Sequence, residues 1–528
     1  MEVSVGSGGT TGTIGFEVDG RQVTVPDDGA SLLEALRDRL GVRSPKDGCS
    51  PQGQCGCCTV LVDGAPRVAC VTPARRVAGR RITTIDGLAD AGRWADAFCR
   101  TGASQCGFCT PGIIVRLAGI EARGTAADDE AAVERALAAH LCRCTGWRTI
   151  LDAWSDATGP EGQRAERDLD RAAQRATLEG GVPQRVGPEV GLGRGGFADD
   201  LAPPDALVAV LDPDGGWAVA ETLVEARAAA GKVQGRRTTR RVTHPLELPA
   251  GDWDVTLRTT WVEPAYLETD ASWSEPGGEP MTPLANGGAF GGKVTSVAPT
   301  AARELADRYG RPVRVLLARE DTVRLGPKRP PIAAGVNADG TGIVRTVRTE
   351  GIAETMTSYA PGLVVDEVDV AGPPTSTAVR AAGWAEAAVL VAAARSGASS
   401  GPVRVAAPNG AVAEADVSPD GRVLVRVRCG DPLDHVVLRS YCTGAAHMAL
   451  GWVSSEAIAV DESGRCLDLT IRSFGVLRAS DTPSIEVEIE ADDRPPVAGS
   501  DAVFVAVAAA AWIAQGCPPE WPTGHHWR

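Results

Sequence analysis

The sequence predicts an α+β multidomain protein, and three observations support this fold class. The chain has 528 residues, which is enough for three or four compact units at about 100–200 residues per domain. Hydrophobic residues make up 43% of the chain, so several cores can be filled. Along the chain, a short unit of strands and one helix precedes a helical stretch, and a long region of alternating strands and Ala-rich helices follows.

Residues 1–88 are predicted to form the first unit, a small α+β fold. Apolar and polar residues alternate over residues 13–25 on both sides of an Asp-Gly pair, which predicts a β-hairpin. Ser31 and Glu34 match a capping box that opens a helix. A strand-like stretch at 58–64 follows the first group of cysteines.

Residues 89–158 have a helical pattern and are predicted to form the second unit. Helices are expected to begin near Thr110, Thr125 and Thr145, since each threonine precedes residues typical of a first helical turn. Residues 159–198 mix charged helix-like sequence with glycine-rich stretches, which predicts an extended linker.

The linker also contains the nucleotide-binding spacing G-x-G-x-x-G, from Gly191 to Gly196. No strand precedes this spacing and two prolines follow it, so the linker interpretation is favoured. Residues 199–528 are predicted to be a mixed α/β region of one or two domains, and two subdomains would divide it at about 199–395 and 396–528.

Charge and hydropathy exclude several classes of partner. With 53 Lys+Arg and 68 Asp+Glu the formal charge is −15, and an acidic chain with no basic block is a poor ligand for nucleic acid or anionic membranes. The longest apolar run, residues 502–514, is too short to span a bilayer. The N-terminus has neither the basic nor the apolar region of a signal peptide. We expect a cytoplasmic protein with no nucleic-acid and no membrane partner.

Ten of the 14 cysteines lie in the first 144 residues, and eight of these form two close groups. Clustered cysteines in a cytosolic chain hold metal more often than disulfides. The first group has the spacing C-x5-C-x2-C-x11-C, one residue longer in its first gap than a plant-type ferredoxin, and it predicts a [2Fe–2S] site. Its members are Cys49, Cys55, Cys58 and Cys70. Neighbouring glycines let backbone N–H groups turn toward the sulfurs, and Cys57 is expected to point away.

The second group consists of a C-x2-C pair and a C-x-C pair separated by a helical segment. Its members are Cys106, Cys109, Cys142 and Cys144. Each pair precedes a threonine that is expected to cap a helix, so the sulfurs would lie near positive helix N-termini, which lower thiolate pKa values. Zinc is the alternative at both sites, although zinc sites usually pair two C-x2-C turns. His140 is expected on a helix surface and Cys99 in ordinary packing.

The sequences GCSPQGQCGCCTVLVDG and QCGFCTPG…LCRCTGW closely resemble the two iron–sulfur domains of the xanthine dehydrogenase/aldehyde oxidase family of molybdenum hydroxylases. The resemblance covers residues 13–155. It implies a plant-ferredoxin-like β-grasp domain followed by a four-helix domain, with one [2Fe–2S] cluster held by each cysteine group. It also makes Gln105 a candidate contact of molybdopterin.

The region after residue 198 resembles the family's molybdenum domain in a shortened form. Residues 287–293, GGAFGGK, are similar to a loop near the metal centre, and Arg380 aligns with an arginine near the cofactor. The loop residues implied at this molybdopterin-like site are Gly287, Gly288, Phe290 and Gly291. Two family segments are missing: a glutamine-bearing segment before the loop and a Gly-Gln-Gly segment that helps hold the pterin.

The family's catalytic Gly-Glu appears here as Ser500-Asp501. This makes Asp501 the candidate catalytic base, one methylene shorter than glutamate, and a misplacement near 1 Å can cost about a hundredfold in rate. The favoured interpretation is that Asp501 caps the Ala-rich helix that follows. The region is then a molybdenum domain reduced to its scaffold.

Three functions stay open at this point. The favoured one is the iron–sulfur electron-transfer component of a xanthine dehydrogenase/aldehyde oxidase-type oxidoreductase. Its partners would be molybdenum-containing or FAD-containing subunits, or another electron acceptor, since no FAD domain is recognised in the chain. The first alternative is a self-contained, flavin-free hydroxylase that binds molybdopterin and oxidises an aldehyde or an N-heterocycle. The second alternative is a zinc-stabilised interaction protein.

Overall fold

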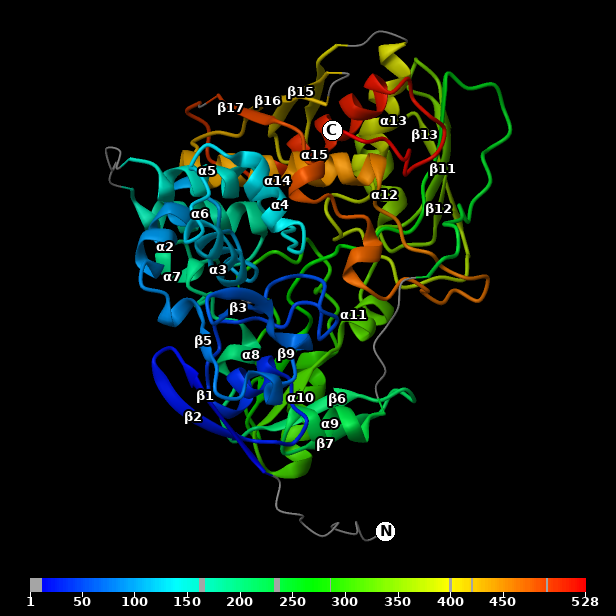
Figure 1. The fold of residues 1–528 in the computed structure, drawn as a ribbon. Coiled ribbons are helices and arrows are strands. Elements are labelled where there is room, and N and C mark those ends of the chain that lie inside the picture. The colour runs from blue at the N-terminus through cyan, green and yellow to red at the C-terminus, as the bar shows by residue number, and fades with distance from the viewer. Residues whose placement is uncertain are drawn as a thin grey trace.

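The N-terminal unit of the computed structural model is a five-stranded mixed sheet with a short helix beside it (Figure 1). The sheet order is β2-β1-β5-β3-β4, with β1 (Thr13–Val18), β2 (Arg21–Pro26), β3 (Thr59–Val62), β4 (Ala65–Val68) and β5 (Arg81–Thr83). β1 and β2 form the expected antiparallel hairpin, and β5 runs parallel to β1. The predicted capping box is also present at α1 (Leu32–Glu34), because Ser31 and Glu34 each accept the other's backbone N–H.

The structure describes residues 12–160, 167–231, 238–284, 286–397, 401–418, 421–490 and 492–528.

Four helices follow the sheet: α2 (Ala91–Thr101), α3 (Thr110–Glu121), α4 (Glu130–Leu137) and α5 (Arg148–Thr158). Trp94 of α2 and Trp154 of α5 are buried in their core, with ring centroids 5.9 Å apart. The helix starts expected at Thr125 and Thr145 are wrong, since α4 is capped by Asp129 and α5 starts only after Trp147. The Thr145 hydroxyl lies beside a cysteine sulfur and caps no helix.

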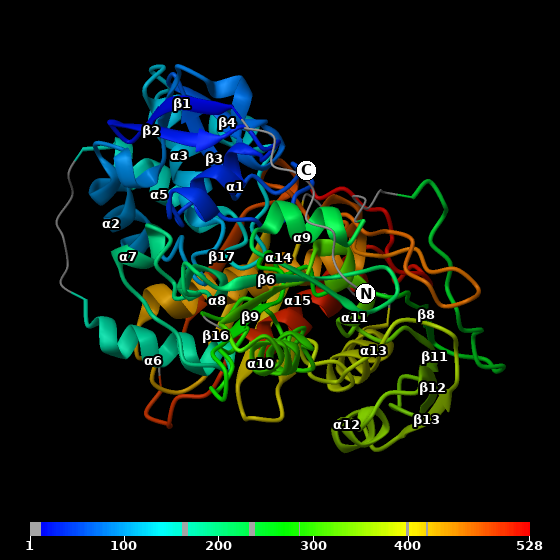
Figure 2. The same ribbon diagram turned by 90° about the horizontal axis from the view of Figure 1, so that it is seen from below.

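The extended linker expected over residues 159–198 is wrong for its described part. Helices occupy much of this stretch: α6 (Leu169–Gly180), α7 (Pro188–Gly191) and the start of α8 (Ala198–Leu201). α6 packs against α14 and α7 against α2 (Figure 2). This stretch packs against the rest of the protein because its ionic side chains pair with residues that are far away in the sequence. Arg167, for example, donates two hydrogen bonds to the Asp434 carboxylate, at 3.0 and 2.8 Å.

Three four-stranded sheets form the described part of the C-terminal region. The first has the order β7-β6-β10-β9: β6 (Leu207–Leu211), β7 (Trp217–Ala220), β9 (Ala271–Ser274) and β10 (Val313–Leu316). The second has the order β13-β12-β11-β8: β8 (Val255–Arg258), β11 (Ile332–Val336), β12 (Gly342–Val347) and β13 (Leu363–Val368). The third runs β14-β15-β16-β17: β14 (Val403–Ala406), β15 (Val412–Val417), β16 (Val423–Arg428) and β17 (Ile485–Ile489).

Seven helices accompany these sheets in the described residues: α9 (Leu223–Ala229), α10 (Ala298–Tyr309), α11 (Arg319–Leu325), α12 (Ile352–Tyr359), α13 (Trp384–Ser396), α14 (His435–Ser454) and α15 (Ser500–Ala514). α15 is buried over almost its whole length between α14 and β15 (Figure 1). The multidomain mixed α/β fold class is confirmed. Among the helices that the structure describes, none has the length and apolar character needed to cross a membrane.

Candidate functional site

The first cysteine group converges in a buried loop of the N-terminal unit. All four side chains are buried: Cys49, Cys55, Cys58 and Cys70. The Cys49 sulfur accepts hydrogen bonds from the backbone N–H groups of Gln52 (3.2 Å) and Gln54 (3.4 Å). The Cys58 sulfur accepts the N–H of Cys70 at 3.4 Å. Inward-turned N–H groups of this kind stabilise anionic sulfur.

Hydrogen bonds among the thiols show that the sulfurs of this group are close together. The Cys55 and Cys70 thiols both hydrogen-bond to Cys49 and hold the pKa of Cys49 well below its usual value, although burial opposes this. Cys57 was expected to point away, and this is wrong. Its side chain is fully buried and hydrogen-bonds to the Cys55 thiol.

The loop that carries these cysteines is tightly packed at two glycines, of which Gly56 also has a backbone conformation that favours glycine. A Cβ atom on Gly48 would lie 3.1 Å from the Cys55 sulfur. Gly56 has a φ of +74°, and a Cβ atom there would lie 2.5 Å from the ring of His140. The buried sulfurs, inward N–H groups and glycine backbone together fit a [2Fe–2S] cluster.

The second cysteine group lies where the four-helix unit meets the C-terminal region. All four side chains are buried: Cys106, Cys109, Cys142 and Cys144. The sulfurs of Cys144 and Cys106 are 3.7 Å apart. A hydrogen bond from the Cys109 thiol, aided by one from Thr145, lowers the pKa of Cys142 to about 7 against the effect of burial. Cys109 is itself the cap residue of α3, so one sulfur lies at a positive helix end as expected.

One hydrogen bond joins the two cysteine groups. The backbone N–H of Leu141 donates to the carbonyl of Cys55 at 3.0 Å, and Leu141 directly precedes Cys142. His140 lies beside this contact, with Nε2 3.1 Å from the hydroxyl of Thr59. The surface position expected for His140 is wrong, because its ring is buried and burial lowers its pKa to about 3. It is therefore a neutral packing residue between the groups.

We expect Gly112→Ala to destabilise this junction. Gly112 lies inside α3, and an added Cβ atom would be 2.4 Å from the carbonyl oxygen of Gly56. Overpacking of this kind costs about 1–3 kcal/mol. The measurement is the midpoint of urea unfolding, monitored by the visible absorbance of the clusters.

The matched control for this variant is Gly92→Ala in α2, where nothing lies within 4 Å of the added Cβ atom. Alanine is the better helix former by up to about 1 kcal/mol, so this variant should be neutral or more stable. Equal shifts of the two midpoints would contradict the tight contact at Gly112.

The glycine loop at residues 287–293 is packed against protein atoms. A Cβ atom on Gly287 would lie 2.7 Å from the Gln184 amide nitrogen, and one on Gly288 would lie 3.1 Å from the Cys106 sulfur. A Cβ atom on Gly291 would lie 1.9 Å from a backbone carbonyl oxygen. The cavity beside the loop has a volume of about 10 Å³. A pocket for a drug-sized ligand needs about 300 Å³ or more, so these residues do not fit molybdopterin.

Two ionic side chains hold this loop, one at its C-terminal end and one at its middle. Lys293 is buried and donates to Glu268 at 2.6 Å. Burial raises the pKa of Glu268 to about 7, although Lys293 acts to lower it. The guanidinium of Arg380 lies 5.3 Å from the ring centroid of Phe290. The loop is therefore held on both sides by the protein itself.

The other residues implied for the cofactor also contact protein groups, while Nε of Arg380 is buried with no hydrogen-bond partner among the residues that the structure describes. The amide of Gln105 donates to the Cys144 carbonyl (3.0 Å) and to the Ser440 hydroxyl (2.9 Å). Asp501 is the second residue of α15, and its carboxylate lies 3.7 Å from Nε of Arg380. The cap role favoured for Asp501 is wrong, since its side chain makes no cap hydrogen bond.

Sequence reasoning missed the two residues that fill this area. Glu179 accepts the N–H groups of Gly499 (3.0 Å) and Ser500 (2.9 Å), so it is the carboxylate at the N-terminus of α15. Gln184 accepts a hydrogen bond from the hydroxyl of Tyr441 at 2.6 Å. The four-residue spacing of Arg175 and Glu179 was a helical signal within the presumed linker.

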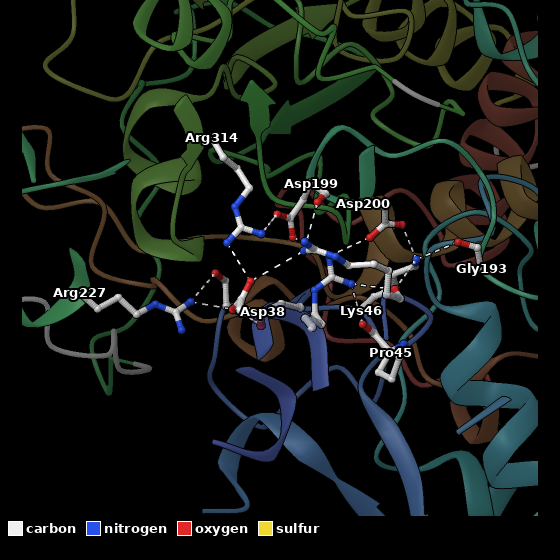
Figure 3. Close-up of polar contacts among 12 residues, drawn as sticks. Asp38, Pro45, Lys46, Gly193, Asp199, Asp200, Arg227 and Arg314 are labelled. Carbon is white, nitrogen blue, oxygen red and sulfur yellow. Dashed lines mark hydrogen bonds and ion pairs between the residues drawn. The ribbon is translucent and has the colours of Figure 1, made fainter. Parts of the chain in front are cut away.

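A buried charge network fixes the N-terminal unit to the rest of the chain (Figure 3). Asp199 accepts from Arg37 of the N-terminal unit at 2.6 Å and from Arg314 of β10 at 2.9 Å. Asp200 accepts from Arg37 at 2.8 Å and is ion-paired with Lys46. Lys46 also donates to the carbonyl of Gly193, at 2.8 Å, so the glycine-rich stretch is held in place.

Two family models match the N-terminal part of the chain. The model described as "2Fe-2S iron-sulfur cluster binding domain" matches residues 16–81, and that described as "[2Fe-2S] binding domain" matches residues 84–155. These ranges contain the first and the second cysteine group, respectively.

Curated proteins are similar over the same part of the chain. The nicotine 6-hydroxylase small subunit of Paenarthrobacter nicotinovorans is 39% identical over 154 residues, which are 29% of this chain and 92% of that protein. The xanthine dehydrogenase iron-sulfur-binding subunit of Escherichia coli O157:H7 is 39% identical, covering 24% of this chain and 82% of that protein. The aldehyde oxidoreductase of Megalodesulfovibrio gigas is 40% identical over 152 residues, which are 27% of this chain but only 16% of that protein.

Solved structures are similar over nearly the whole chain. Aldehyde oxidoreductase from Desulfovibrio gigas matches with a TM-score of 0.66 at 14% identity, covering 94% of this chain and 97% of that one. Aldehyde oxidoreductase from Desulfovibrio desulfuricans matches with a TM-score of 0.64, also at 14% identity, covering 95% and 97%. At this identity the likeness shows the fold alone, and it extends the shared fold into the C-terminal region.

Proposed function

Because the chain belongs to the xanthine dehydrogenase/aldehyde oxidase family of molybdenum hydroxylases, we propose that it is an iron–sulfur electron-transfer component of such an oxidoreductase. It carries two [2Fe–2S] clusters, one held by Cys49, Cys55, Cys58 and Cys70, and one by Cys106, Cys109, Cys142 and Cys144. When bound by these cysteines, a [2Fe–2S] cluster would supply one-electron redox chemistry at each site.

The observation that carries this proposal is the hydrogen bond from Leu141 to Cys55. It connects the backbone of a first-cluster ligand to the residue next to a second-cluster ligand. Electron tunnelling weakens steeply with distance, and this route between ligands consists of covalent bonds and one 3.0 Å hydrogen bond. On this proposal the two clusters would form a relay across one buried junction.

Electrons enter and leave this relay through partner proteins. We propose a molybdenum-containing subunit as the donor and an FAD-containing subunit or another acceptor as the recipient. Support comes from relatives that are named as small or iron–sulfur subunits, and that match this chain over 82–92% of their own length. The relay would run from the second cluster to the first.

The alternative of a self-contained, flavin-free hydroxylase has one observation in its favour. The fold of aldehyde oxidoreductase is matched along almost the whole chain. The packed glycine loop and the 10 Å³ cavity beside it oppose this alternative. A zinc-stabilised interaction protein is disfavoured by the two family models that match both cysteine groups.

Metal analysis and redox titration of the full chain, purified without oxygen, test the proposal. We expect about four irons per chain and uptake of two electrons from dithionite. The reduced protein should give two distinct electron paramagnetic resonance signals, one for each cluster. About two zincs with almost no iron would overturn the proposal. Near-stoichiometric molybdenum together with oxidation of an aldehyde would favour the hydroxylase.

A further inference from the structure

The segment between the iron–sulfur units and the C-terminal sheets lies against the residues that the family resemblance assigns to the cofactor. Its helix α6 begins near Arg167, which is paired with Asp434, the cap residue of α14. Helix α6 packs along α14 (Figure 2). Further along the segment, Gln184 lies beside Gly287 of the glycine loop. Gln105 and Gln184 line one small cavity here, with a volume of about 10 Å³.

The middle of α6 supplies a buried charge to the start of α15. Arg175 and Glu179 form an ion pair at 3.1 Å, and neither side chain has any exposed surface. The Glu179 carboxylate accepts two backbone N–H groups at the N-terminus of α15, while Arg175 donates to the carbonyls of Pro432 and Val497 at 2.8 Å each. The positive end of this 15-residue helix is thus neutralised by an anion of the chain itself.

The end of the segment fills the space in front of the glycine loop. The Gln184 amide nitrogen donates to the Ala176 carbonyl at 2.8 Å, and its oxygen accepts from Tyr441. The amide is therefore fixed where any Cβ atom on Gly287 would strike it. A group larger than a water molecule could therefore lie against Gly287 only if Gln184 moved away.

We infer that residues 167–187 are a built-in plug, in which Glu179 and Gln184 occupy the position of the pterin cofactor. The C-terminal region would then hold no molybdopterin and would serve as a scaffold for the relay. This inference rests on the proposed electron-transfer function and deepens it. We draw this inference because side chains of this chain contact one another where the family resemblance places the cofactor.

The first test measures the pterin itself. The full chain is produced in a host that makes molybdenum cofactor, and the fluorescent pterin released by oxidation is counted per chain beside iron. We expect about four irons and less than about one pterin per twenty chains. One pterin per chain would overturn the plug and leave the clusters intact. Loss of iron without pterin would overturn the electron-transfer function instead, so the two failures are distinct.

The second test is a double-mutant cycle between Gly287→Ala and Gln184→Ala. In the wild-type background, Gly287→Ala should lower the melting temperature by roughly 3–8 °C, because the new Cβ atom meets the Gln184 amide. In the Gln184→Ala background, Gly287→Ala should lower the melting temperature by less than about half of that amount. Equal losses in both backgrounds would overturn the placement of Gln184.

The cycle has a matched control at Gly277. This residue has a similar φ of +69°, and nothing lies within 4 Å of an added Cβ atom. Gly277→Ala therefore brings the same backbone strain without the contact, and its loss should be the same with and without Gln184. A background-dependent loss at Gly277 would mean that Gln184→Ala acts globally, which would also overturn the inference.

Discussion

Replacing Cys58 by serine is expected to lower the iron content from about four to about two per chain. Cys58 is buried, and its sulfur accepts the backbone N–H of Cys70, so the substitution removes one of the four proposed ligands from a site with little access to water. Cys109→Ser should have the same effect on the second cluster, because its thiol is hydrogen-bonded to Cys142. Iron analysis with electron paramagnetic resonance of the reduced protein distinguishes the variants, since each should lose a different signal.

Cys57 provides a demanding control for this experiment. It is as deeply buried as the proposed ligands and lies between two of them in the sequence, and its thiol contacts that of Cys55. Cys57→Ala should nevertheless keep about four irons and both signals. If Cys57→Ala lost two irons while Cys58→Ser kept four, the ligand assignment would have to be exchanged. Unchanged iron in all three variants would refute both clusters.

The cysteine groups could be predicted because a cluster imposes its requirements on a short piece of chain. In the first group, three of the cysteines lie in one short glycine-rich turn, from Cys49 to Cys58, and that pattern is visible in the sequence. The capping box at Ser31 and the hairpin before it were predictable for the same reason, since both depend on local contacts.

Contacts between distant segments could not be predicted. His140 looked like a surface residue of a helical stretch, but it is enclosed by Gly56 and Thr59 of the other unit. Arg175 and Glu179 looked like a solvated helical pair, yet the carbonyls that accept from Arg175 lie more than 250 residues further along the chain. The local sequence pattern around a residue does not indicate partners that lie so far along the chain.

Contacts between distant segments also could not be predicted for the molybdenum-like region. Its motifs correctly identified a related fold, because glycine loops and buried helices persist when a fold is kept. They could not show what occupies the space in front of these motifs. Asp501 appeared to be either a base or a cap, and the structure gives the cap role to Glu179 from the presumed linker.

Asp199→Asn is expected to destabilise the attachment of the N-terminal unit by about 3 kcal/mol. Burial alone would raise the pKa of Asp199, but Arg314 and Arg37 lower it well below its usual value, so the carboxylate is ionised at neutral pH. Asparagine would remove that charge and turn an N–H group toward a guanidinium. The expected result is a fall of up to roughly 1 M in the urea midpoint, monitored by the visible absorbance of the clusters.

The pH dependence and a surface variant separate this effect from a general loss of stability. A carboxyl group whose folded pKa is depressed stabilises the fold fully above its ordinary pKa of 3.8, and the stabilisation is lost as the pH falls further. The difference between wild type and Asp199→Asn should therefore be constant from about pH 5.5 to pH 8. Asp369→Asn breaks an exposed pair with Arg348 and should leave the midpoint almost unchanged. If both variants shifted the midpoint equally, the buried charge network would not be what holds the relay against its scaffold.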